Sequence, residues 1–234
     1  MPPSSMRRLL WVVVFGVAFG FVEASVVVYL RDLYYPGGFA FPLKLMTPGH
    51  LLIELVREAA TIIMLATVAM LGGTKSWSRF GFFIVAFGVW DIFYYVWLKA
   101  ALNWPGSVFD WDILFLIPVP WIGPVIAPVL VSAMMIVFGW IIVFRLEKGK
   151  SFTPGPLSWV LSILGVACVL YSFMNDTRAT LYGEEPAPYS YTLLVACLVL
   201  CLAAFVLASK PRPAMPNVNT LHDERSKEVS REST

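Results

Sequence analysis

Six long apolar runs, separated by short polar segments, dominate this sequence and restrict its folds. The runs cover about residues 8–30, 50–72, 80–101, 121–145, 157–175 and 190–209. A stretch of about 20 apolar residues is long enough to cross a bilayer as a helix. The runs are continuous and do not alternate with polar residues, as the strands of a membrane β-barrel would. The sequence therefore predicts an all-α, polytopic integral membrane protein, with about six transmembrane helices in one domain over residues 1–209.

The composition supports this class. Of the 234 residues, 59% are hydrophobic and 14% are charged, and the mean hydropathy is +0.75. A soluble domain is usually about 25% charged. The net charge of +2 indicates no strongly charged partner, and no segment resembles a nucleic-acid module, so the expected partner is the lipid bilayer. The three cysteines, Cys168, Cys197 and Cys201, lie inside apolar runs. We therefore expect them to act as small apolar residues rather than as metal ligands or redox groups.

Basic residues between the runs are unevenly distributed. With six spans, one side carries Arg7, Arg8, Lys75, Arg79, Arg145, Lys148, Lys150, Lys210 and Arg212. The other side carries Arg31, Lys44, Lys99 and Arg178, together with Asp110, Asp112, Asp176, Glu184 and Glu185. Because cytoplasmic loops are enriched in lysine and arginine, we predict a cell-membrane protein with both termini in the cytoplasm.

The two ends of the chain allow separate predictions. Residues 1–24 combine a basic start, an apolar stretch and Val22-Glu23-Ala24, which is similar to a signal-peptide cleavage site. The apolar run continues beyond this point, which favours an uncleaved first span, although the cleaved alternative stays open. Residues 210–234 are polar with mixed charge and are predicted to form a disordered cytoplasmic tail.

Ionisable side chains stand at the head of the second run, in the sequence GHLLIELVREAAT. At about 100° per residue, five polar side chains share one arc of about 100° on a helix. They are His50, Glu54, Arg57, Glu58 and Thr61. Charged groups are costly in hydrocarbon, so this face is predicted to meet protein or water rather than lipid.

Two other runs place acidic groups at a similar depth. Glu23 lies past the middle of the first run, and Asp91 lies near the middle of the third, followed by Tyr94 and Tyr95. The first run also contains Gly16-x-x-x-Gly20, a spacing that lets helices approach closely. Glu23 is therefore expected beside the second or third helix. A tyrosine hydroxyl beside a carboxylate can hold it by a hydrogen bond or relay a proton.

The segment before the fourth run is rich in proline. It contains Pro118, Pro120, Pro124 and Pro128, and is preceded by Asp110 and Asp112. Proline removes amide donors and bends helices, and irregular backbone is tolerated at membrane depth where it lines a cavity. We expect either a re-entrant segment that covers the polar cluster or a plain outer turn before a kinked helix.

Together these groups suggest an outward-facing intramembrane pocket with an acidic excess, which a proton, water or a bound cation must relieve. The first hypothesis is a metal-dependent membrane enzyme acting on a lipid or another apolar small molecule. Its metal ligands would be Glu23, His50, Glu54, Glu58 and Asp91, a set that suits zinc, iron or manganese. Its catalytic groups would be Glu54, Asp91, Arg57, Tyr94 and Tyr95, with Arg57 orienting carboxylates or a substrate anion.

Three alternatives remain open. The first is a proton- or cation-coupled transporter in which Glu54 or Asp91 changes its protonation state, although no internal repeat is visible. The second is a structural subunit that binds other membrane subunits of a larger complex. The third is an internal ion-pair network around Arg57 that only specifies helix packing. The sequence alone decides neither the substrate nor whether the protein is an enzyme.

Overall fold

The computed structural model describes residues 5–44, 46–176 and 181–210. Its long helices are α1 (Ser5–Tyr34), α2 (Pro48–Gly72), α3 (Ser76–Leu102), α4 (Ile126–Glu147), α5 (Pro156–Met174) and α7 (Tyr191–Ser209). Five of these are long and apolar enough to cross a membrane, and α2 is of similar length but carries Glu54, Arg57 and Glu58. The prediction of an all-α membrane bundle is confirmed. The predicted tail beyond Lys210 and the basic residue Arg178 lie outside the described residues.

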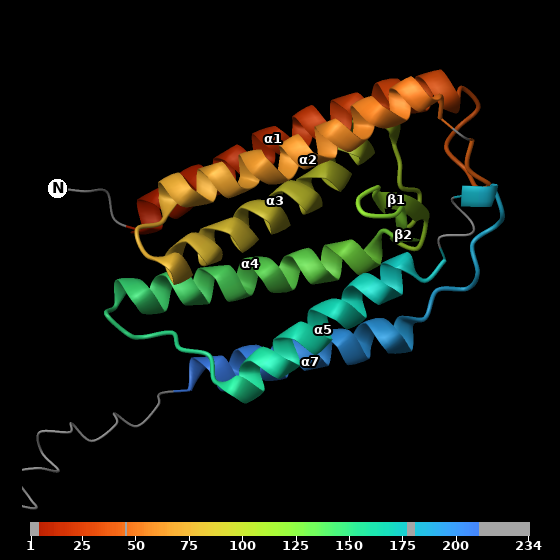
Figure 1. Ribbon diagram of the computed structural model, residues 1–234. Coiled ribbons are helices and arrows are strands. Elements are labelled where there is room, and N and C mark those ends of the chain that lie inside the picture. The colour runs from red at the N-terminus through yellow and green to blue at the C-terminus, as the bar shows by residue number, and fades with distance from the viewer. Residues whose placement is uncertain (1–4, 45, 177–180, 211–234) are drawn as a thin grey trace, which may run out of the picture.

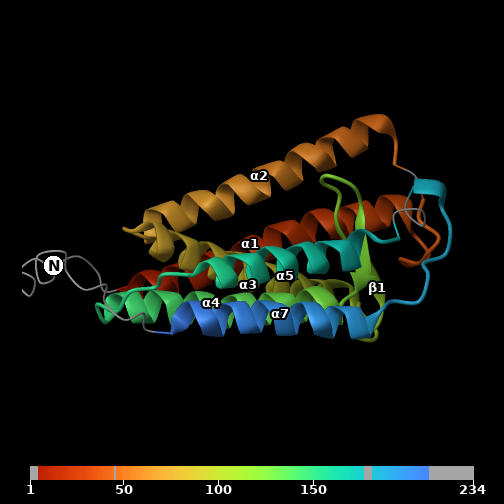
Figure 2. The same ribbon diagram turned by 60° about the horizontal axis from the view of Figure 1, so that its bottom comes forward.

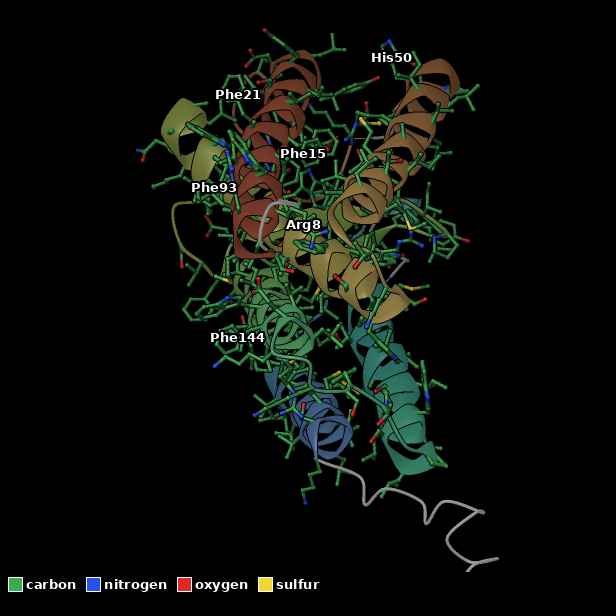
Figure 3. All side chains as sticks on the ribbon, turned by 90° about the vertical axis from the view of Figure 1, so that its left-hand side faces the viewer. Arg8, Phe15, Phe21, His50, Phe93 and Phe144 are labelled. Atoms are coloured by element: carbon green, nitrogen blue, oxygen red, sulfur yellow. A yellow bond between two sulfur atoms is a disulfide. The ribbon has the colours of Figure 1, made fainter. Side chains whose placement is uncertain are left out.

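Consecutive helices run antiparallel, so the bundle has two distinct ends (Figure 1). Helices α1, α2 and α3 form one group, α5 and α7 form a second, and α4 lies between them (Figures 1 and 3). A small hairpin of β1 (Trp111–Phe115) and β2 (Trp121–Pro124) lies at the end where α1, α3 and α5 finish (Figure 2). We call this the hairpin end of the bundle.

Local signals place the helix termini around the polar cluster. Thr47 is the N-cap of α2, its hydroxyl accepts a hydrogen bond from the His50 backbone N–H at 3.4 Å, and Pro48 follows at the first helical position. Helix α3 ends at Leu102, and its C-cap Asn103 adopts the left-handed conformation at φ 54°. Asparagine is one of the few non-glycine residues that tolerates it. These termini bring the polar ends of α2 and α3 to the hairpin end.

Helix α1 packs on α3 through its small residues, as its Gly-x-x-x-Gly spacing predicts. A Cβ added at Gly16 would lie 2.9 Å from Val89 Cγ1, and one added at Gly20 would lie 2.9 Å from the Trp90 carbonyl oxygen. Only glycine permits this approach of the two backbones. The contact fixes the rotation of α1 and turns Glu23 towards α2.

A second glycine contact, which the sequence analysis missed, joins α3 to α4. A Cβ at Gly139 would lie 2.5 Å from the Gly81 carbonyl oxygen, and one at Gly88 would lie 2.5 Å from the Ser132 carbonyl oxygen. In both helices the two contact residues are seven positions apart, which is close to two helical turns. This seven-residue spacing of small residues is the sequence signal that could have predicted the contact between α3 and α4. The contact sets the axial register of α3 against α4.

The structure corrects the predicted start of the fourth span. Residues 121–124 form β2, which pairs antiparallel with β1, and α4 begins only at Ile126. The prolines of this segment lack the amide donors that an earlier helix would need. The backbone instead bonds across the segment: Val125 N–H donates to the Asp110 carbonyl at 3.0 Å. The hairpin folds back against α2, because the Leu116 N–H donates to the Glu58 carboxylate.

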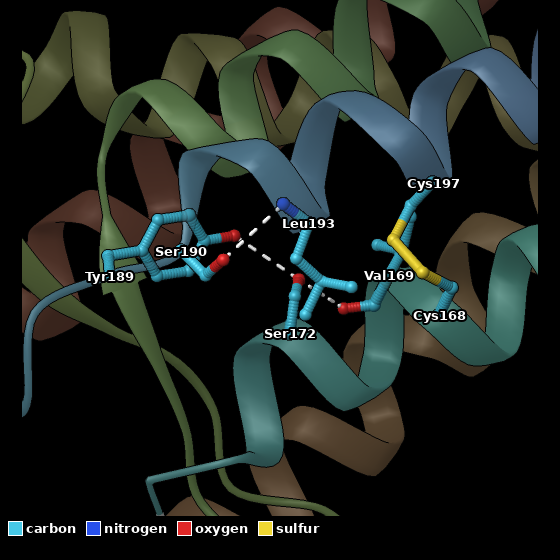
Figure 4. The surroundings of a disulfide bond; sticks show 7 residues. All are labelled: Cys168, Val169, Ser172, Tyr189, Ser190, Leu193 and Cys197. Atoms are coloured by element: carbon cyan, nitrogen blue, oxygen red, sulfur yellow. Dashed lines mark hydrogen bonds between the residues drawn. A yellow bond between two sulfur atoms is a disulfide. The ribbon is translucent and has the colours of Figure 1, made fainter.

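A disulfide between Cys168 and Cys197 joins α5 to α7 (Figure 4). The expectation that these two cysteines act only as small apolar residues was wrong. Antiparallel packing of α5 and α7 brings their Cα atoms to 5.5 Å, which lies in the usual range for a disulfide. Cys201 is the free cysteine and contacts Gly165 of α5.

A thiol count tests this bridge. Unreduced, denatured full-length protein is expected to offer one reactive thiol, that of Cys201, and three after reduction. Maleimide labelling followed by intact-mass measurement gives both numbers. In the control variant Cys201→Ser, the counts should fall to none and two. Three labels on unreduced wild-type protein would show that the bridge is absent.

Candidate functional site

A cavity of about 260 Å³ lies at the hairpin end, between α1, α2, α3 and the β-hairpin. We call it the polar cavity, because ionisable side chains line it together with apolar ones. Its lining includes seven of the eight predicted site residues: Glu23, Glu54, Arg57, Glu58, Asp91, Tyr94 and Tyr95. The structure thus brings these groups together from three helices. The chemical roles assigned to them stay predictions.

Arg57 connects α1 to α2 at the base of this cavity. It forms an ion pair with Glu23 of α1, and its Nη2 lies 2.7 Å from Glu54 Oε2, one turn earlier on α2. The Thr61 hydroxyl donates to Glu23 Oε1 at 2.6 Å. Glu23 and Glu54 are buried, whereas the Arg57 side chain keeps 22% of its exposure. The Arg57 guanidinium therefore pairs with two buried carboxylates, so this group of three side chains contains one more carboxylate than cation.

Glu58 has a different kind of partner. The Leu116 backbone N–H donates to both of its carboxylate oxygens, at 3.0 Å and 2.8 Å. Glu58 is 5% exposed, and none of the ion pairs in the described segments includes it. These two contacts attach the tip of the hairpin to α2.

Asp91 lines the cavity from α3. It accepts a hydrogen bond from the Ser132 hydroxyl of α4 at 2.8 Å, and within the described ranges it too belongs to no ion pair. Tyr94, one turn further along α3, is directed to Asp112 instead, since its hydroxyl lies 3.5 Å from Asp112 Oδ2. Glu58 and Asp91 are thus the two carboxylates of the cavity that form no direct ion pair with a described side chain.

A buried pair that the sequence analysis missed, Arg31 with Asp112, forms another wall. Arg31 Nη2 lies 3.0 Å from Asp112 Oδ1, and both residues are buried. The guanidinium carbon lies 3.6 Å from the Trp104 ring centroid and 4.3 Å from that of Phe39, so the cation contacts both rings. Burial raises the pKa of the Asp112 carboxyl to about 6, and the Arg31 charge opposes that rise.

The sequence had placed Arg31 and Asp112 among the loop charges of the outer side. One signal could have identified Arg31. It follows Glu23 by eight residues, a little over two helical turns, so both side chains project from neighbouring faces of α1. No such sequence signal identifies Asp112, because its burial depends on the pairing of β1 with β2.

His50 stands apart from the other predicted ligands. It is exposed at the start of α2, and its ring Nδ1 lies 2.5 Å from the Tyr34 hydroxyl. Figure 3 shows it at the far end of α2, where α2 diverges from α1. Across residues 5–44, 46–176 and 181–210, no group of three His, Cys, Asp or Glu side chains lies close enough to hold a metal ion. The five proposed ligands therefore do not converge on one point.

A second, apolar cavity of about 640 Å³ lies between the α3–α4 pair and the α5–α7 pair. Apolar side chains such as Phe87, Met135 and Phe205 line most of it. It shares four lining residues with the polar cavity: Trp90, Asp91, Leu114 and Phe115. The polar cavity and the apolar cavity thus border the same small group of side chains. This second cavity could not be predicted from the sequence, because apolar residues that line a cavity have the same hydropathy as lipid-facing ones.

The geometry can hold a small molecule that has both a polar and an apolar part. Buried carboxylates, two arginines and tyrosines supply acceptors and donors on one side, and hydrocarbon surface lies on the other. Comparisons of the chain with protein-family models, with curated proteins and with solved structures find no match.

Proposed function

We propose that this multi-pass membrane protein binds an amphipathic lipid, with the headgroup in the polar cavity and the hydrocarbon part in the apolar cavity. The observation that carries this proposal is the set of residues common to both cavities, Trp90, Asp91, Leu114 and Phe115. A single molecule that passes this set and enters both cavities would need a polar group at one end and hydrocarbon at the other.

The cavity sizes support a divided ligand. Pockets for small ligands usually measure about 300–1,000 Å³. The polar cavity, at about 260 Å³, suits a compact headgroup, whereas the apolar cavity, at about 640 Å³, has room for hydrocarbon. A lipid chain that enters from the bilayer passes from one hydrocarbon environment to another, so its transfer adds little hydrophobic free energy. The apolar cavity would therefore select the chain by its fit, and the polar cavity would select the headgroup by hydrogen bonds and ion pairs.

The disulfide supports an orientation with the hairpin end outside the cytoplasm. Cys168 and Cys197 lie in the halves of α5 and α7 nearer the hairpin end. Disulfides persist in oxidising compartments and are rare in the cytosol. The distribution of lysine and arginine independently predicts cytoplasmic termini. In this orientation the lipid would be drawn from the outer leaflet with its headgroup already at the level of the polar cavity.

The other predicted functions fit less of the geometry. The dispersed ligands give no geometric support to a metal centre, and an ion-pair network alone leaves both cavities without a role. A coupled carrier shares part of this arrangement, because Asp91 borders both cavities, and it stays a prediction. Binding to a larger complex likewise stays a prediction.

Filling the apolar cavity tests the proposal. Ser162 lines this cavity on α5, and Ser162→Trp should displace several methylenes of a bound chain. The full chain is reconstituted with phosphatidylethanolamine and phosphatidylglycerol, extracted in mild detergent, and examined by native mass spectrometry. Wild-type protein should retain lipid, and the variant should retain on the order of tenfold less, because the indole fills space that the chain would occupy and overpacking costs about 1–3 kcal/mol.

The matched control is Ile163→Trp, one position along the same helix. Ile163 is 63% exposed and does not line the apolar cavity, so its replacement should leave lipid retention unchanged. Equal retention by the two tryptophan variants, or no retained lipid on wild-type protein, would contradict the proposed function.

A further inference from the structure

Arg31 has a hydrogen-bonding group that its protein partners do not use. Its Nη2 pairs with Asp112, but its Nη1 is buried and has no hydrogen-bond partner among the described residues. Arg31 is 6% exposed and lines the polar cavity. A buried donor on a charged group that is left unsatisfied is costly, so an acceptor from outside the chain is expected here.

A second residue that lines the same cavity also has an unsatisfied donor. Trp90 Nε1 is buried and lacks a hydrogen-bond partner in the described part of the chain, and Trp90 is 7% exposed. It belongs to a different helix from Arg31. Two independent buried donors therefore indicate that the occupant brings acceptor oxygens. Arginine pairs best with phosphate or carboxylate, because its planar fork matches their geometry.

The carboxylates of the cavity indicate a second requirement. Glu23 and Glu54 share Arg57, Asp112 pairs with Arg31, and Glu58 and Asp91 have no cation in any ion pair of the described segments. A purely anionic occupant would add charge to this acidic excess. A primary ammonium group would reduce it and could donate hydrogen bonds to a carboxylate.

From these observations we infer that the headgroup carries both a phosphate, which accepts from Arg31 Nη1, and a primary ammonium group, which donates to Glu58 or Asp91. The ligand class is a zwitterionic aminophospholipid, and this inference rests on the proposed lipid-binding function. Arg31 is preorganised for the phosphate, because the Trp104 and Phe39 rings and Asp112 hold its guanidinium in place. The headgroup would satisfy the unused donor and offset the acidic excess at once.

Headgroup competition on the full chain tests the assignment. Phosphatidylethanolamine, phosphatidylglycerol, phosphatidylcholine and diacylglycerol with identical chains are offered in equal amounts, and retention is measured by native mass spectrometry. Phosphatidylethanolamine should be retained at least about tenfold better than the other three, because only it combines a phosphate with ammonium N–H donors.

Arg31→Lys is the informative variant. Lysine keeps the charge beside Asp112 but loses the second arm of the planar fork. It should lower retention of phosphatidylethanolamine by about tenfold or more and leave diacylglycerol, which lacks a phosphate, unchanged. Arg79→Lys is the control, because Arg79 donates to the Gly73 carbonyl and does not line the polar cavity.

The outcomes separate the two proposals. Equal retention of phosphatidylethanolamine and phosphatidylcholine or phosphatidylglycerol, or an unaffected Arg31→Lys variant, would overturn the headgroup assignment while lipid binding stands. Displacement of the lipid by soluble phosphoethanolamine at the same concentration would assign the site to a free phosphate ligand and overturn the lipid class. No lipid retention, with no effect of Ser162→Trp, would overturn the proposed function and this inference together.

Discussion

Replacing Arg31 with methionine is expected to lower the free energy of unfolding by about 3–5 kcal/mol. The change leaves the Asp112 carboxylate buried without its cation, and such a charge costs far more than the lost contact. It also removes the cation–π contacts with Trp104 and Phe39. Thermal unfolding in detergent, followed by tryptophan fluorescence and by the fraction that stays monomeric, measures the loss.

The double variant Arg31→Met with Asp112→Leu is the control for this result. Replacing a buried ion pair by apolar residues of similar volume is often neutral or stabilising, so stability should return close to the wild-type value. Recovery would show that the single variant fails because of the unpaired charge. A double variant as unstable as the single one would mean that Arg31 acts through packing on the rings instead.

Introducing leucine at Gly139 is expected to have the second large effect. The new Cβ alone would lie 2.5 Å from the Gly81 carbonyl oxygen and 2.6 Å from Val85 Cγ2, so α3 and α4 must separate. Overpacking usually costs about 1–3 kcal/mol, and a clash with backbone cannot be relieved by a rotamer change. We expect a loss of about 3 kcal/mol or more, measured by the same unfolding experiment.

Gly49→Leu provides the matched control. Gly49 lies on α2, and a Cβ at this position would meet nothing within 4 Å. Its replacement should leave stability within about 0.5 kcal/mol of wild type. Separation of α3 from α4 would also break the Ser132–Asp91 hydrogen bond, so Gly139→Leu should weaken lipid retention in addition. Wild-type stability in Gly139→Leu would show that the two backbones do not approach as closely as described.

Helix identity and the polar face of α2 were predictable, because they depend on local properties of the chain. Continuous hydropathy predicts a spanning helix, and residues on one face of α2 follow from its 3.6-residue period. The Gly16–Gly20 spacing predicted the close approach of α1 that places Glu23 beside α2. The depth of Glu23, Glu54, Arg57, Glu58 and Asp91 likewise followed from their positions within the runs, and all five line one cavity.

The partner of each charge was not predictable in the same way. Arg31 and Asp112 are 81 residues apart, and their contact requires the rotation of α1, the register of α3 and the pairing of a hairpin all to be set. The start of α4 was misplaced for a related reason: hydropathy does not distinguish a buried strand from the first turn of a buried helix. His50 shares the polar arc of α2, yet the divergence of α2 from α1 leaves it outside the cavity.

The sequence by itself determined a bundle of membrane-spanning helices, their alternating direction and the gathering of ionisable groups near one end. These properties depend on hydropathy and helical period, which neighbouring residues carry. Only the tertiary structure decided the Cys168–Cys197 bridge, the Arg31–Asp112 pair and the polar and apolar cavities that meet at Asp91. Each of these joins segments far apart in the chain, and their meeting depends on how closely the helix backbones approach and at which register.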